Sequence, residues 1–150
     1  MNHCELAVAA FLEGYNCAQA VAVAFSDVTG LDKDLSARLA SPFGGGMGRM
    51  REVCGAVSGM LMVAGLLYGY DDPKATTAKR ELYAQVQEMA EAFRKENGSI
   101  ICRDLLKNPP SDPNPSPRTP AYYSSRPCAR MVATATQILD TYIQEHPINR

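Results

Sequence analysis

The stretch that decides the fold is SPFGGGMGRMREVCGAVSGMLMVAGLLYG, residues 41–69. A cluster of glycines leads into two arginines, then into one cysteine, and then into an apolar run. Small residues recur along one side of residues 55–68, which predicts a helix that packs closely against a neighbour. Gly55 and Gly59 lie four residues apart and therefore on one face of this helix. We expect them to give room beside Cys54.

Capping and periodicity signals predict helices along most of the remaining chain. Asn16, with Gln19 three residues later, predicts a capping box that begins a helix. Asp72 and Pro73 predict the start of a long helix that ends at Gly98. No alternation of polar and apolar residues lasts long enough to predict a strand. The expected fold class is an all-α bundle of five to seven helices, over residues 5–12, 16–27, 34–40, 55–68, 73–97, 99–106 and 125–144.

One segment does not fit a helix. Residues 108–127, NPPSDPNPSPRTPAYYSSRP, hold seven of the ten prolines. Proline interrupts helices and central strands, so we expect one long proline-rich loop over residues 108–126. The chain beyond it is too short for a second core. Residues 1–150 are therefore expected to form a single helical domain.

The composition excludes several classes of function. The net charge of −1 argues against nucleic acid as a partner, because such proteins need a basic face. The longest apolar run is shorter than the roughly 18–20 residues that cross a bilayer, so no membrane insertion is expected. The first residues show neither a basic region nor a cleavage site of a signal peptide. A cytoplasmic location is therefore expected.

The five cysteines stand far apart, and no C-x-x-C pair occurs. In a reducing compartment they are not expected to form structural disulfides. Four of them fall in the first turn of a predicted helix: Cys17, Cys54, Cys102 and Cys128. The positive end of a helix dipole favours a thiolate there, as do the nearby arginines at positions 49, 51, 103, 126 and 130. Cys4 lies on the outer edge of the first helix and is interpreted as a bystander.

Cys54 is the predicted attacking thiol. It follows a glycine loop that we expect to be mobile, and Arg49 and Arg51 lie close to it in sequence. These features predict a pKa below the roughly 8.5 of a free thiol. The chain has only two histidines, near its two ends, so neither a Cys–His nucleophile nor mixed Cys/His zinc ligation is expected.

Several short motifs resemble one family. The segments GYNCAQAV at residues 14–21, CGAVSG at 54–59 and GLLYG at 65–69, with lone cysteines at 102 and 128, resemble the C_GCAxxG_C_C family. Its members are small helical proteins for which redox activity is proposed. The resemblance covers nearly the whole chain, and all four family cysteines have a counterpart here: Cys17, Cys54, Cys102 and Cys128. Cys4 has none.

The family is in turn similar to the non-haem part of split-Soret cytochromes, where cysteines hold an iron–sulfur cluster. This chain lacks the haem-attachment motif, so the resemblance implies no haem. It does imply a cluster or another metal as one use of the four thiols.

Three functions therefore stay open at this point. The first is an oxidoreductase that works by thiol–disulfide exchange, with two of the four cysteines cycling. The second is an electron carrier or sensor in which Cys17, Cys54, Cys102 and Cys128 bind an iron–sulfur cluster or zinc. The third is a structural or protein-interaction domain with incidental buried cysteines. The first two predict that the four sulfurs share one pocket. They also predict a redox partner protein, and they are compatible with a homodimer.

Overall fold

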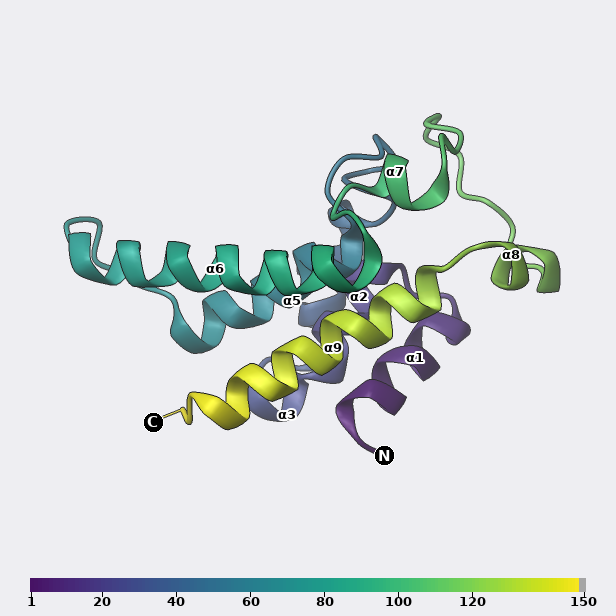
Figure 1. The fold of residues 1–150 in the computed structure, drawn as a ribbon. Coiled ribbons are helices and arrows are strands. Elements are labelled where there is room, and N and C mark those ends of the chain that lie inside the picture. The colour runs from purple at the N-terminus through teal and green to yellow at the C-terminus, as the bar shows by residue number, and fades with distance from the viewer. Residues whose placement is uncertain (149–150) are drawn as a thin grey trace.

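The computed structural model describes residues 1–148, and every regular element in that range is a helix (Figure 1). The all-α fold class is thus confirmed. Nine α-helices and the short 3₁₀ helix η1 occur in these residues, more than the five to seven helices expected. Their bounds are α1 His3–Glu13, α2 Cys17–Ala24, α3 Ser26–Thr29, α4 Lys33–Ala40, η1 Ser41–Phe43, α5 Gly55–Tyr68, α6 Thr76–Asn97, α7 Cys102–Leu106, α8 Pro120–Ser125 and α9 Cys128–Glu145.

The core is built around α5, the most apolar helix, which packs on α2. Gly59 makes this close approach possible, because a Cβ there would lie 2.6 Å from the carbonyl oxygen of Ala18. Helix α9 crosses the bundle and packs on α1, α2, α5 and α6 (Figure 1). The predicted close packing of the small-residue face is confirmed. No helix within residues 1–148 is both long and apolar enough to cross a membrane.

Helix α6 is the longest element, and its first half extends beyond the bundle (Figure 1). Only Met89 and Phe93 of this helix are fully buried, both in its second half. The helix begins at Thr76 and not at Pro73 as expected. The reason is local, because the Asp72 carboxylate accepts a hydrogen bond from the Lys74 amide at 2.9 Å and so forms a turn.

Other helix bounds also differ from the sequence-based expectation: α7 begins at Cys102 and not at 99, and α9 begins at Cys128 and not at 125. The segment predicted as one helix over 16–27 breaks at Phe25, whose φ of −101° and ψ of 17° are not helical, into α2 and α3. The proline-rich segment contains the short helix α8, where no helix was expected. Proline is tolerated at the first helical position, and the Thr119 hydroxyl caps the helix by accepting from the Tyr122 amide at 3.1 Å.

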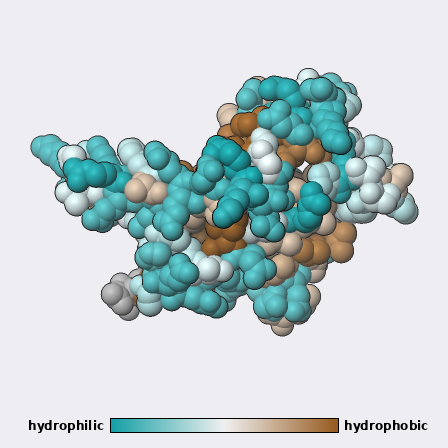
Figure 2. Space-filling view, viewed as in Figure 1, coloured by the Kyte–Doolittle hydropathy of each residue, from teal (hydrophilic) through white to brown (hydrophobic). Residues whose placement is uncertain are grey.

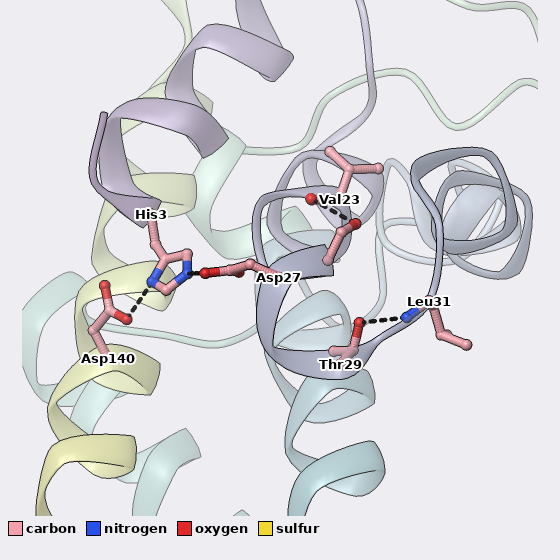
Figure 3. Close-up of polar contacts among 7 residues, drawn as sticks. His3, Val23, Asp27, Thr29, Leu31 and Asp140 are labelled. Carbon is pink, nitrogen blue, oxygen red and sulfur yellow. Dashed lines mark hydrogen bonds and ion pairs between the residues drawn. The ribbon is translucent and has the colours of Figure 1, made fainter.

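His3 ties the first helix to two later ones (Figure 3). Its Nδ1 lies 2.7 Å from an Asp140 carboxylate oxygen of α9, and its Nε2 lies 2.9 Å from Asp27 of α3. The ring also stacks on Phe25 with the ring centroids 4.2 Å apart. This contact fixes the N-terminal end of α1 at the end of the bundle away from α7 and α8.

Candidate functional site

Each of the four cysteines singled out in the sequence stands at the start of a helix, as expected. Cys17, Cys102 and Cys128 are the first residues of α2, α7 and α9, and Cys54 is the residue before α5. Backbone N–H groups at a helix start have no partner within the helix, and they carry the positive end of its dipole. All five cysteines of the chain, Cys4 included, are free thiols.

A single antiparallel bridge brings Cys54 and Cys102 together. Val53 pairs with Ile101. Cys54 and Cys102 follow these two residues, so α5 and α7 begin next to each other. The Cys102 amide donates to the carbonyl of Glu52 at 2.6 Å and completes the pairing. Two cysteines that are remote in the sequence are thereby held on neighbouring strand-like segments.

The glycine loop before Cys54 is a tightly folded turn with backbone hydrogen bonds of its own. Its backbone closes on itself, for example where the Glu52 amide donates to the Gly46 carbonyl at 2.9 Å. Gly46 has a φ of +73°, and a Cβ on it would lie 2.8 Å from the Cβ of Cys102. Residues with a side chain rarely adopt that backbone conformation, and a Cβ would have no room, so glycine is required here. The loop lets α7 approach closely.

Gly55 plays the same part for Cys17. A Cβ on Gly55 would lie 3.2 Å from the Cβ of Cys17 and 2.9 Å from the Phe43 carbonyl oxygen. The glycine directly after Cys54 therefore allows the start of α2 to lie against the start of α5. On its other side, the Cys17 thiol is hydrogen-bonded to the sulfur of Cys128.

All four cysteines line one cavity of about 420 Å³. Glycines of the loop, arginines, prolines of the proline-rich segment, and several apolar and polar side chains form the rest of its wall. Seen from the side shown in Figure 2, brown hydrophobic atoms are visible in the recess below the lobe that contains α7. The structure thus brings together the four cysteines that the sequence placed at separate helix starts. Cys4 does not line this cavity.

Cys128 is the thiol that ionises most readily. A hydrogen bond from Cys17 lowers the pKa of Cys128 to about 7, and Arg126, Arg118 and Arg51 act in the same direction against the effect of burial. The same hydrogen bond, together with burial, raises the pKa of Cys17 well above its ordinary value. The two opposite shifts favour a thiolate on Cys128 with the proton kept on Cys17.

The prediction that Cys54 has a lowered pKa is wrong. Burial raises the pKa of Cys54 to about 12, although the backbone amides of Ala56 and Val57 act in the opposite direction. Desolvation of the charged form outweighs the helix start here. Burial also raises the pKa of Cys102, against the opposing effect of Arg51.

Arg126 acts on Cys128 as the sequence suggested, but Arg51 and Arg103 contact other partners. Arg51 is two per cent exposed and directs Nη1 to the sulfur of Cys102 at 3.6 Å, not to Cys54. Its φ of +63° lies in the left-handed region. Arg103, next to Cys102 in the sequence, instead pairs with Glu52 at 3.4 Å on the surface. Arg130 is exposed.

Arg118 is a site residue that sequence reasoning missed. Its guanidinium donates to the carbonyl oxygens of Phe11 and Tyr15, both at 2.9 Å, and so fixes the proline-rich segment to the end of α1. It also lies 4.6 Å from the Phe11 ring centroid and 4.9 Å from that of Tyr122. No local motif marks this arginine, because its partners come from the other end of the chain.

The arrangement of the four thiols also bears on whether they can bind a metal. Within residues 1–148, no group of three or more His, Cys, Asp or Glu side chains is placed so that it could hold a metal ion. The four thiols have the right chemistry for zinc or an iron–sulfur cluster. As they lie, however, they do not form a ready-made site for either.

The chain was then compared with known proteins. Residues 15–142 match the model of the family described as "Putative redox-active protein (C_GCAxxG_C_C)". Those residues include all four cysteines of the cavity and leave out Cys4. Neither a curated protein nor a solved structure matches the chain significantly.

Proposed function

Because the chain belongs to the C_GCAxxG_C_C family, for which redox activity is proposed, we propose that it carries out thiol–disulfide exchange through Cys128 and Cys17. The observation that supports this is the hydrogen bond between these two thiols inside a cavity that arginines line. A thiolate is the species that attacks a disulfide, and Cys128 is the thiol whose pKa lies near neutral pH.

Each cysteine then has a separate role. Cys128 is the attacking residue. Cys17 is the resolving residue, because its hydrogen bond to Cys128 keeps the two sulfurs together. Cys54 and Cys102 remain protonated, because burial raises the pKa of both. They line the cavity and are the second pair that further oxidation would reach.

The exchange proceeds in two displacement steps. The Cys128 thiolate attacks one sulfur of a disulfide, which forms a mixed disulfide and releases the first thiolate of the substrate. Cys17 then gives up its proton to solvent, and its sulfur attacks the sulfur of Cys128. A Cys17–Cys128 disulfide forms and the second substrate thiolate leaves. The substrate gains two electrons, and a dithiol reductant restores the protein.

Mapping the disulfide tests this proposal. The reduced protein is exposed without oxygen to a small excess of a disulfide, its remaining thiols are alkylated, and its peptides are analysed by mass spectrometry. We expect a Cys17–Cys128 link in the wild-type protein and in Cys4→Ser. We expect a trapped mixed disulfide on Cys128 in Cys17→Ser. Oxidation that leaves Cys17 and Cys128 unlinked would contradict the proposal.

Metal analysis of the same preparation separates the two redox functions. Protein purified without oxygen should be colourless and should contain less than one zinc or iron per chain. Bound metal that Cys128→Ser releases would favour the metal centre instead, with the four thiols moving together to bind it. If neither metal nor exchange is found, the cysteines are buried small residues of an interaction domain.

A further inference from the structure

The cavity of the four thiols is also strongly basic. Four arginines line it, Arg49, Arg51, Arg118 and Arg126, whereas none of the described residues in its wall is Asp or Glu. Of the four, Arg49 lies 3.9 Å from the exposed Asp112 carboxylate. Within residues 1–148 the other three have no carboxylate within ion-pair distance.

Arg51 holds the most unusual of these charges. Its Nε donates to the Pro110 carbonyl oxygen at 2.8 Å and its Nη1 lies 3.6 Å from the Cys102 sulfur. Its Nη2 is buried and has no hydrogen-bond partner among the described residues. A buried guanidinium is costly unless an anion compensates it. Cys102 does not supply that anion, because burial keeps its thiol protonated.

Arg126 extends the basic wall toward Cys128. Its Nη2 donates to the Ser116 hydroxyl at 3.2 Å, and its guanidinium lies 4.5 Å from the centroid of the Tyr122 ring. Both contacts hold the side chain in place without neutralising it. One thiolate, on Cys128, therefore faces three guanidinium groups that have no carboxylate partner among the described residues, and the cavity keeps a net positive charge.

The size of the cavity and the burial of the thiols limit what can enter. Cys54, Cys102 and Cys128 are each at most seven per cent exposed. The disulfide of a folded protein cannot bring its sulfur to such a thiol without opening the site. A cavity of about 420 Å³ is instead within the range that small molecules occupy.

From these observations we infer that the substrate is a small disulfide with carboxylate or sulfonate groups, bound through Arg51 and Arg126. This inference rests on the proposed exchange at Cys128 and names its oxidising substrate. The anionic groups take the free donors of the guanidinium groups and bring one substrate sulfur to Cys128. The exchange then follows the two displacement steps given above, and the two released thiolates keep their anionic groups.

Three small disulfides that carry the same two-carbon spacer on each sulfur test the inference. They are bis(2-sulfoethyl) disulfide, which is anionic, bis(2-hydroxyethyl) disulfide, which is neutral, and cystamine, which is cationic. The rate of oxidation of the reduced full-length protein is measured with each, near neutral pH and at about 0.15 M salt, where distant charges are screened. Each rate constant is divided by that of a free thiol with the same disulfide.

We expect the anionic disulfide to react about tenfold faster than the neutral one, and the cationic one to react slowest. Arg126→Gln should lower the anionic-to-neutral ratio by about tenfold, the size of one lost charge-assisted hydrogen bond. A loss of Cys128 reactivity alone would slow all three disulfides together and leave this ratio unchanged. Arg103→Gln, on the surface and outside the cavity, is the matched control and should keep the wild-type ratio.

Arg51→Met gives a second measurement, because its apolar side chain has a similar length and needs no counterion. The anionic-to-neutral ratio of rate constants in Arg51→Met should also fall by about tenfold. Equal normalised rates for the three disulfides would overturn the inference and leave the proposed exchange standing. Rates no faster than those of the free thiol, with all three disulfides, would overturn both.

Discussion

Gly59 of α5 lies so close to Ala18 of α2 that a Cβ at this position would stand 2.6 Å from the Ala18 carbonyl oxygen. This contact joins the two helices whose starts hold Cys54 and Cys17. Gly59→Ala should destabilise the protein by about 2 kcal/mol, because the two helices would have to move apart. Urea denaturation of the wild-type and variant proteins measures this difference.

Gly65→Ala is the matched control in the same helix. A Cβ at Gly65 meets no atom within 4 Å, and its φ lies outside the left-handed region. Alanine there should stabilise the protein by about 0.5–1 kcal/mol through its higher helix propensity. If both alanine variants lose the same stability, the proposed role of Gly59 in the packing is wrong.

Cys128 should be the first thiol to react with iodoacetamide near neutral pH. Its reaction rate should rise with pH through a midpoint of about 7 and then level off. Cys54 should stay unmodified, because burial raises its pKa to about 12. Mass spectrometry of peptides after short exposure to the reagent gives the rate at each cysteine.

Substitution of Cys17 tests the hydrogen bond itself. Cys17→Ala removes the donor and should move the midpoint of Cys128 alkylation to higher pH. Cys17→Ser keeps a hydroxyl donor and should move it less. A midpoint that is the same in all three proteins would show that the arginines alone, and not Cys17, lower the pKa of Cys128.

His3 should make the stability depend on pH. Burial lowers its pKa, but hydrogen bonds and charge interactions with Asp27 and Asp140 outweigh this and raise it above 6.5. The stabilisation is therefore complete below the unfolded-state pKa and is lost as the pH rises through the folded-state pKa. Between about pH 5 and pH 8, the stability difference between wild type and His3→Gln should be largest at the acidic end. Urea midpoints across this range test it, and a constant difference would contradict it.

Arg118 should hold the proline-rich segment closed over the cavity. Arg118→Gln loses the bonds to the carbonyl oxygens of Phe11 and Tyr15, so limited proteolysis within residues 108–119 should become several-fold faster. Arg130→Gln, an exposed arginine of α9, is the control and should be cut at the wild-type rate. Equal cleavage of all three proteins would show that other contacts hold this segment.

The sequence by itself determined what depends on residues close together in the chain. Asn16 and Gln19 form the capping box that their spacing predicted, with both hydrogen bonds present. The four cysteines stand at helix starts, and the glycines after Cys54 pack against α2, as their spacing indicated. Hydrogen bonds over three or four residues and the period of a helix set these features, so a local pattern suffices to predict them.

Only the tertiary structure decided which thiol ionises and which arginines surround it. Arg51 stands three residues before Cys54, yet the left-handed turn at Arg51 and the Val53–Ile101 bridge bring it to Cys102 instead. Cys128 gains its low pKa from Cys17 first, which no local pattern connects with it, and then from Arg126, which the sequence does place beside it, and from the remote Arg118 and Arg51. Burial and long-range charge fix a pKa, and both exist only once the helices have packed.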